Sequence, residues 1–167
     1  MAIRLATREE APRLAGIIRA AFRDVAERFG LTAETAPTHP SFCTAAWIEK
    51  GLDKGVRYYL GEDGARAWGC VALERANPHL CYLERLAVLS EYRRTGLGKA
   101  LVDHVVTEAR ALGARRVEIA IIADHRELRD WYLRLGFSAI KTVRFERLPF
   151  AVMFMERALH GDSAEGV

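Results

Sequence analysis

The sequence predicts one domain of the mixed α/β class, with a mostly antiparallel central sheet and helices on both faces. Three β-like runs lie between residues 56 and 88 with only short turns between them, which indicates hairpins and antiparallel pairing. An amphipathic helix then separates the run that ends at Val88 from the next run, and such a β-α-β unit requires a right-handed parallel crossover. That next run, 117–122 (VEIAII), is almost wholly apolar, as is typical of a strand buried on both faces.

The N-terminal third is expected to contain a short strand and two helices. Ile3–Leu5 is the strand, and Thr7 with Glu10 forms a capping box that opens a helix closed by Gly30. Residues 31–41 contain two prolines and no periodicity, so they are expected to form a loop. A shorter helix is expected from about Thr44 to Lys54. The apolar stripe of the first helix consists of Leu14, Ile18, Phe22, Val25 and Phe29.

The remaining elements alternate between strands and helices. Asp124 is expected to cap the last helix, which Gly136 ends. The expected order is strand Val56–Leu60, turn Gly61–Gly64, strand Arg66–Arg75, strand Leu80–Val88, helix Leu97–Leu112, strand Val117–Ile122, helix His125–Leu135, strand Ala139–Phe145 and strand Phe150–Met155. The whole chain therefore reads β-α-α-β-β-β-α-β-α-β-β. We expect a single domain over residues 1–158 and a disordered tail over residues 159–167.

The composition is ordinary for a globular protein, with 50% hydrophobic and 28% charged residues. A net charge of +3 over 167 residues is too small and too dispersed to indicate a nucleic-acid-binding surface. No apolar run approaches the ~20 residues that span a bilayer, and the N-terminus lacks the apolar region of a signal peptide. The three cysteines form no CxxC pair and are expected to be reduced core residues. These features predict a cytoplasmic protein with no nucleic-acid or membrane partner.

Residues 93–101 (RRTGLGKAL) hold the strongest functional signal. Their two glycines allow backbone N–H groups to turn toward an anion, and the helix that starts here adds unpaired donors and a positive dipole end. With three basic side chains, the stretch predicts binding of a phosphate or diphosphate. A Walker A loop is excluded because Arg93 and Ala100 stand where it needs Gly and Ser or Thr. A dinucleotide-binding loop is excluded because Leu101 stands at its third glycine position.

Two motifs and the order of the elements resemble a known family. In the first motif, Arg93 is followed at the third position by Gly96 and at the fifth by Gly98. Following the strand 82–88, this stretch resembles the acetyl-CoA loop of the GNAT family of N-acetyltransferases. The second motif, residues 131–137 (WYLRLGF), is similar to the F-Y-E-K-L-G-F block at the end of that family's following helix. The element order is similar to that of the family across nearly the whole chain.

The resemblance implies acetyl-CoA as co-substrate and assigns residues to its binding. The strand end at 86–88 would offer its backbone to the pantetheine arm, much as a peptide extends a sheet edge. His125 stands where the family often has Asn, and it either contacts the cofactor or merely starts a helix. A solvated pair of charges is the alternative for the two arginines of the loop. The implied cofactor-binding residues are Leu86, Ala87, Val88, Arg93, Arg94, Thr95, Gly96, Leu97, Gly98, Lys99, His125 and Tyr132.

The resemblance also places Tyr132 near the thioester sulfur as the catalytic acid. A phenol with a pKa of about 10 is a weaker acid than a thiol with a pKa of about 8.5, so direct proton transfer is uphill by ~2 kcal/mol. Tyr132 is therefore expected to position the sulfur as much as to protonate it. The alternative is a core tyrosine whose hydroxyl is satisfied by a protein group.

A base is also expected, because deprotonating an alkylammonium with a pKa of about 10.4 at pH 7 costs about 4.6 kcal/mol. Glu84 is the catalytic candidate, since strand alternation places it on a Tyr82/Glu84/Leu86 face beside the thioester. The alternative for Glu84 is a salt bridge, for instance with Arg75. Tyr82, acting through water, is a weaker candidate.

The function implied by the resemblance is transfer of an acetyl group from acetyl-CoA to a primary amine by direct attack in a ternary complex. A non-catalytic acyl-CoA-binding regulatory domain is the alternative. No metal motif and no GxSxG serine are present in the sequence. In the family, Phe29–Phe42 and Arg144–Phe150 would select the acceptor, which is either a small-molecule or a protein amine. The acyl chain length and a homodimeric state are left open.

Overall fold

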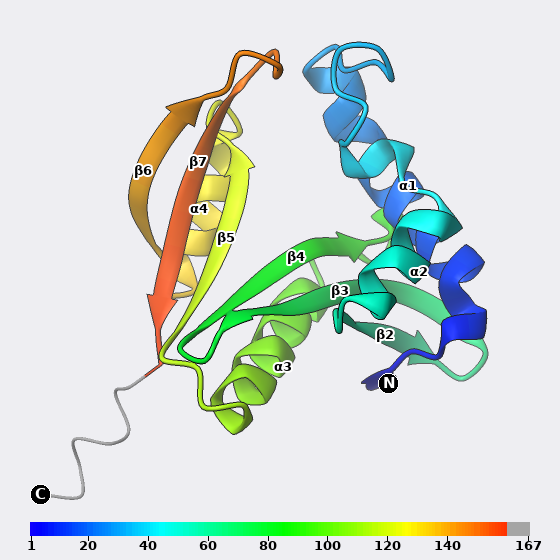
Figure 1. Cartoon of the computed structure of the whole chain (residues 1–167). Helices are drawn as coiled ribbons and strands as arrows, with labels where there is room; N and C mark the ends of the chain where they lie inside the picture. The colour runs from blue at the N-terminus through cyan, green and yellow to red at the C-terminus, as the bar shows by residue number, and fades with distance from the viewer. Residues whose placement is uncertain (160–167) are drawn as a thin grey trace, which may run out of the picture.

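The computed structural model describes residues 1–159, which form a seven-stranded sheet with helices on both faces (Figure 1). The fold class expected from the sequence is confirmed. The strands lie in the order β1-β2-β3-β4-β5-β7-β6, and every neighbouring pair is antiparallel except β4 and β5. They are β1 (Ala2–Leu5), β2 (Arg57–Asp63), β3 (Arg66–Asn77), β4 (Leu80–Val88), β5 (Arg116–Ile122), β6 (Ser138–Arg144) and β7 (Ala151–Ala158).

The helices divide the interior into two apolar layers. Helices α1 (Ala11–Arg28) and α2 (Ala45–Asp53) cover one face of β2–β4, and their residues pack with Tyr58 and Leu60. Helices α3 (Leu97–Ala111) and α4 (Arg126–Arg134) pack on the opposite face, with Leu83 and Ile119 (Figure 1). We call these the α1/α2 face and the α3/α4 face. Short 3-10 turns lie at Arg8–Glu10, Pro40–Phe42 and Ser90–Tyr92.

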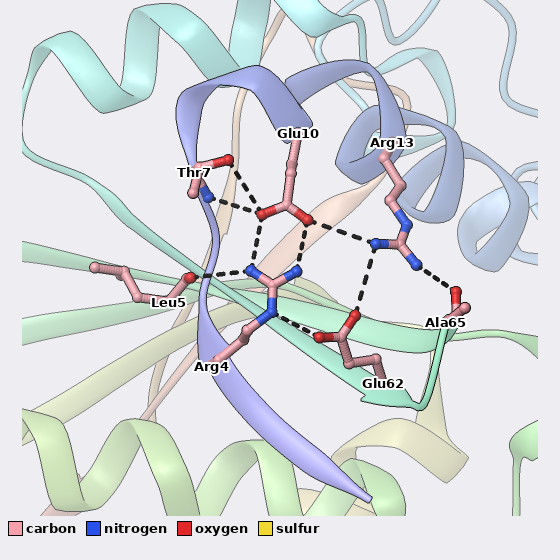
Figure 2. A network of polar contacts seen from close by, with 7 residues as sticks. All are labelled: Arg4, Leu5, Thr7, Glu10, Arg13, Glu62 and Ala65. Atoms are coloured by element: carbon pink, nitrogen blue, oxygen red, sulfur yellow. Dashed lines mark hydrogen bonds and ion pairs between the residues drawn. The ribbon is translucent and has the colours of Figure 1, made fainter.

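A network of charged side chains joins β1, the start of the first helix and the β2–β3 turn (Figure 2). Arg4 donates to Glu62 through Nε (2.6 Å) and to both carboxylate oxygens of Glu10 (2.8 Å each). Arg13 lies between the same two carboxylates, at 3.5 and 3.6 Å, and also donates to the carbonyl of Ala65 (2.9 Å). Segments about 50 residues apart in the sequence are thereby held together at the edge of the sheet.

Local details both confirm and correct the sequence interpretation. The Thr7–Glu10 capping box is present. Gly61 lies inside β2 rather than in the turn. Because it has no side chain, the Trp68 ring can pack against it; a Cβ there would lie 2.5 Å from that ring. Asp124 is not the cap of α4. His125 is, and its Nδ1 accepts the N–H of the third helical residue (3.4 Å).

All three cysteines are buried and unpaired. Leu159, the first residue of the expected tail, is buried, and its N–H donates to the carbonyl of Arg115 (2.8 Å). The rest of that predicted tail, residues 160–167, lies outside the described residues. No helix within residues 1–159 is both long enough and apolar enough to cross a membrane.

Candidate active site

The candidate site lies where β4 and β5 separate. Register pairs join Leu80–Tyr82 to Arg116–Glu118, and beyond these pairs the strands diverge (Figure 1). The edge of β4 after Tyr82 is therefore without a strand partner on that side and can pair with an extended ligand. A cavity of about 260 Å³ opens at the divergence; its lining residues are Tyr82, Leu83, Glu84, Glu118, Ile119, Ala120 and Phe154.

A β-bulge in β4 determines which side chains face the α1/α2 layer. The β3–β4 register shifts after the pair formed by Ala72 and Glu84, and Arg85 has a φ of +50°. Ala72 belongs to the α1/α2 cluster, so Glu84 opposite it lies on that face, whereas Leu86 packs with the α3/α4 cluster. The prediction that Glu84 and Leu86 share one face is therefore wrong, because the inserted residue interrupts the strict alternation of the strand.

The carboxyl group of Glu84 has the properties of a base that works near neutral pH. Burial raises the pKa of Glu84 to about 7, and a hydrogen bond and charge repulsion from Glu74 act in the same direction. The positive charge of Arg85 lowers the pKa of Glu84, and this is the smallest of the four effects. The Arg85 guanidinium donates to the hydroxyl of Tyr58. Arg75 lies on the α3/α4 face and so does not form the alternative salt bridge. Near pH 7 the Glu84 carboxyl can both accept and release a proton.

The loop before α3 has a backbone suited to an anion. Arg94 (φ +62°) and Gly96 (φ +84°) both have left-handed backbone conformations, which turn successive N–H groups toward one side. Gly96 is the N-cap of α3, and the first bond along the helix runs from the N–H of Ala100 to its carbonyl (3.1 Å). The three amides before Ala100 have no acceptor within the helix, and the positive end of the helix dipole lies there. This geometry fits a diphosphate.

The Arg93 side chain is engaged by the protein itself. Its guanidinium donates to Asp24 (2.8 Å) and to the carbonyl of Ala21 (2.6 Å) on α1, and to the carbonyl of Val88 (3.1 Å). Arg93 therefore tethers the loop to α1. The Arg93 side chain is thus bonded within the protein rather than solvated as a free charge.

Two other side chains of the loop also bond locally. The Thr95 hydroxyl donates to the carbonyl of Tyr92, and the Lys99 ammonium pairs with Asp103 one turn along α3 (2.8 Å). Asp103 thus offsets the positive charge that Lys99 places at the positive end of the helix dipole. The fit of the loop to an anion consequently rests mainly on backbone amides, together with the exposed side chain of Arg94.

Helix α4 packs directly behind this loop. A Cβ at Gly98 would lie 3.3 Å from the Trp131 ring and 3.8 Å from Val88, so glycine lets the first turn of α3 approach α4. The Tyr132 ring is only 4% exposed and lies edge-on to Trp131 (4.9 Å) and Phe137 (5.3 Å). Burial raises the pKa of Tyr132 above its usual value, so its hydroxyl stays protonated and can donate a hydrogen bond.

His125 lies at the start of α4, against the end of α1. Its ring is 5.8 Å from that of Phe29, and Nδ1 accepts the N–H of Leu128 and lies 3.4 Å from Glu127. Burial and the nearby Arg28 lower the pKa of His125. The structure thus shows the helix-start role, while a contact with the cofactor stays a prediction.

The predicted residues fall on both sides of the opening between β4 and β5. Glu84 faces the α1/α2 layer, whereas the 93–99 loop and Tyr132 lie with the α3/α4 layer. Sequence reasoning missed Glu74 beside Glu84 and Glu118 in the cavity, and it gave no role to Trp131, the first residue of the second motif. Glu118 carries a signal in the sequence, because it interrupts the otherwise apolar run VEIAII.

The segments expected to select the acceptor also meet in space. Phe29 and Leu31 of the first segment pack with Phe150 of the second and with Ile122 at the end of β5. A larger hollow of about 440 Å³ lies beside α1 and the α1–α2 loop, but neither Glu84 nor Tyr132 lines it. The smaller cavity has Glu84 in its wall, and Tyr132 lines neither of the two hollows.

Comparison with known proteins assigns the family. The model of the acetyltransferase (GNAT) family matches residues 11–137, about three quarters of the chain, so the protein belongs to the GNAT family of acetyltransferases. Members of this family use acetyl-CoA. The matched residues include both predicted motifs, helices α1 to α4 and strands β2 to β5, whereas β1, β6 and β7 lie outside them.

Solved structures share the fold at low sequence identity. A ribosomal-protein-alanine N-acetyltransferase from Brucella melitensis is 21% identical, with a TM-score of 0.71 over 95% of this chain and 100% of the other. A putative acetyltransferase from Salmonella typhimurium with acetyl-CoA is 20% identical, with a TM-score of 0.69 over 95% and 94%. A GNAT acetyltransferase from Elizabethkingia anophelis with acetyl-CoA bound is 15% identical, with a TM-score of 0.59 over 68% and 82%.

Proposed function

We propose that this protein transfers an acetyl group from acetyl-CoA to a primary amine by direct attack within a ternary complex. The observation that carries the proposal is the division of the site between two faces of the sheet. The carboxyl of Glu84 is on the α1/α2 face, and the amide-rich loop and Tyr132 are on the α3/α4 face. Donor and acceptor can therefore approach the opening between β4 and β5 from opposite sides.

The α3/α4 side supplies groups that fit acetyl-CoA. Bound there, acetyl-CoA supplies an activated acetyl group and a thiol leaving group. The amides from Arg94 to Lys99 would hold the diphosphate, with the Arg94 side chain adding positive charge. The unpaired edge of β4, at Leu86, Ala87 and Val88, would offer backbone donors and acceptors to the pantetheine amides.

Glu84 would take the proton that the acceptor ammonium must lose. With a pKa of about 7 rather than 4.5, its carboxylate reduces the cost of that transfer by roughly 3 kcal/mol. A carboxyl with a pKa of about 7 has an ionised form available near neutral pH, and this form is a stronger base than an ordinary carboxylate. The neutral amine nitrogen then attacks the carbonyl carbon of the acetyl group, and the amide bond forms as the bond to sulfur breaks.

Tyr132 would donate a hydrogen bond to the departing sulfur. Because its pKa is raised by burial, the phenol holds its proton more firmly than an exposed tyrosine. Stabilising the thiolate by hydrogen bonding is therefore favoured over complete proton transfer.

The test uses purified protein, acetyl-CoA labelled in the acetyl group, and a cell extract divided into small-molecule and protein fractions. We expect label to appear as an amide on an amine, and kcat to fall in Tyr132→Phe and Glu84→Gln. Tight binding of acetyl-CoA with no label on any amine would overturn the proposal. Unchanged turnover in both variants would overturn the roles assigned to these residues.

A further inference from the structure

We infer that the acceptor is a small aliphatic polyamine, with the reacting amine at Glu84 and a second ammonium at Glu118. This inference rests on the proposed function and names the substrate class of the same site. It comes from the placement of the acidic side chains on the α1/α2 face of the sheet, from the cavity between them and from the apolar part of its wall.

The sheet register aligns acidic residues across four strands. Glu74 of β3 is opposite Tyr82 of β4, Tyr82 is level with Glu118 of β5, and Glu118 is opposite Glu156 of β7. Residues in register across a sheet lie on the same face, so this row shares the α1/α2 face with Glu84, two residues further along β4. The site thus combines the proposed base with a second carboxylate on the facing wall of the cavity.

Within the described part of the chain, Glu156 is the one carboxylate of this row that pairs with a basic side chain. Glu156 lies 3.6 Å from the Nε of Arg116. Within residues 1–159, Glu74, Glu84 and Glu118 take part in none of the ion pairs with lysine or arginine. Carboxylates in a half-buried cavity are costly without a cation nearby, so a cationic ligand is favoured there.

The basic residue that follows Glu84 in the chain is turned away from this role. Arg85 donates to the hydroxyl of Tyr58, and its guanidinium lies 5.8 Å from the centre of the Trp47 ring. The cation that would most readily neutralise Glu84 is therefore held by an aromatic pair on α2 and β2. A ligand ammonium at Glu84 therefore need not displace the Arg85 guanidinium from its own contacts.

The apolar part of the cavity wall on this face suits a methylene chain. Leu83, Ile119, Ala120 and Phe154 also line the cavity; the first two have their side chains on the α3/α4 face, so Ala120 and Phe154 are the apolar side chains on the face of the carboxylates. The Phe154 ring already holds one alkylammonium, because the Lys141 Nζ lies 5.3 Å from its centre. Such a contact shows that this ring can interact with an aliphatic cation.

The spacing of the two carboxylates limits the length of the ligand. Glu84 is two residues beyond the rung of Glu118, and the two side chains stand on adjacent strands. Their Cα atoms would be about 8 Å apart in a regular sheet, and more where the strands diverge. A short diamine bonded to both side chains from within the cavity spans this separation. A single amine leaves Glu118 without a partner.

The experiment compares three amines that differ in the second group: putrescine, its amino-alcohol analogue with a hydroxyl in place of one amine, and butylamine. Turnover is followed by release of free CoA thiol, and binding by calorimetry. We expect kcat/KM for putrescine to exceed that for the amino alcohol by about tenfold or more. The second ammonium of putrescine forms a charge-assisted hydrogen bond with Glu118, which is stronger than the bond of a hydroxyl. In Glu118→Gln this ratio should fall close to one.

Glu156→Gln is the matched control, since its carboxylate is on the same face one strand further and already faces Arg116. It should keep the wild-type ratio. Equal kcat/KM for putrescine and the amino alcohol, or an unchanged ratio in Glu118→Gln, would overturn the inference. If none of these amines is acetylated although the cell extract contains an amine that takes up label, the inference is overturned and the proposed function stands. If no amine of the extract is labelled either, the proposed function fails, and calorimetry decides the inference separately: preference for putrescine that is lost in Glu118→Gln supports it, and equal binding overturns it.

Discussion

The Arg93 guanidinium binds Asp24 of α1 at 2.8 Å and so joins the loop before α3 to the helix on the opposite face of the sheet. An exposed ion pair alone contributes little to stability. Here, however, the same guanidinium also donates to the carbonyls of Ala21 and Val88, at 2.6 and 3.1 Å. Charge-assisted hydrogen bonds to fixed carbonyls stabilise the contact and also fix the orientation of the guanidinium. The position of the loop therefore depends on α1.

Replacing Arg93 by alanine should loosen the loop and lower the stability of the fold. We expect the free energy of unfolding to fall by about 1–3 kcal/mol, since three hydrogen bonds to a charged group are lost. The Kd for acetyl-CoA should rise severalfold because the loop amides lose their fixed orientation. Thermal denaturation and calorimetry measure the two effects. Arg94→Ala is the control, and it should weaken acetyl-CoA binding without lowering Tm; equal Tm losses in both variants would contradict the tether.

The pH dependence of activity should report the carboxyl of Glu84. Because its pKa is about 7 and the ionised form is the base, kcat/KM should rise as the pH increases through 7. Glu84→Gln should lower kcat by about 10²–10⁴-fold and remove this inflection. Initial rates from pH 5.5 to 9 test both points. An inflection near pH 7 that survives in Glu84→Gln would assign the base to another group.

Adding a methyl group at Gly98 should weaken cofactor binding more than it weakens the fold. The new Cβ would lie 3.3 Å from Trp131, so the first turn of α3 must shift, and its amides shift with it. We expect a severalfold higher Kd for acetyl-CoA in Gly98→Ala, measured by calorimetry. Gly16→Ala is the matched control, because its Cβ meets only the end of the Arg19 side chain, at 3.9 Å. That variant should keep the wild-type Kd and gain up to about 1 kcal/mol of stability.

The network around Arg4 should make stability depend on pH in the acid range. Hydrogen bonding by Arg4, followed by that of Thr7, lowers the pKa of Glu10 from 4.5 to about 2. A carboxyl group with a lowered folded-state pKa contributes stability that is complete above pH 4.5 and disappears as the pH falls toward 2. The Tm of Glu10→Gln should thus lie below that of the wild type at pH 7, with a difference that shrinks below pH 4.5. Glu9→Gln is the control, because Glu9 lies next to Glu10 but outside this network.

The loop could be predicted from the sequence because its signals are local. The spacing of Gly96 and Gly98 before an apolar-periodic helix contains both the turn and the start of α3. The block that contains Tyr132 is equally local. The burial of Tyr132 against Trp131 then follows from the position of α4 on the sheet.

The environment of Glu84 could not be predicted in the same way. A non-glycine residue with positive φ, Arg85, inserts itself into β4 and changes the face of every residue after it. The contact with Glu74 depends on the register between two strands, which the sequence alone does not specify. Similarly, counting the charges of the loop does not reveal that Arg93 is neutralised by Asp24, nearly 70 residues earlier in the chain.

The divergence of β4 and β5 has a consequence for the protein outside catalysis. Beyond Tyr82, the edge of β4 facing β5 is not joined to another strand, although it lies in the middle of the sheet rather than at its border. An unpaired edge is a template for any extended chain, including a second unfolded copy. A ligand that lies along this edge would shield it and favour the native state by mass action. The supply of cofactor would then protect the protein against aggregation.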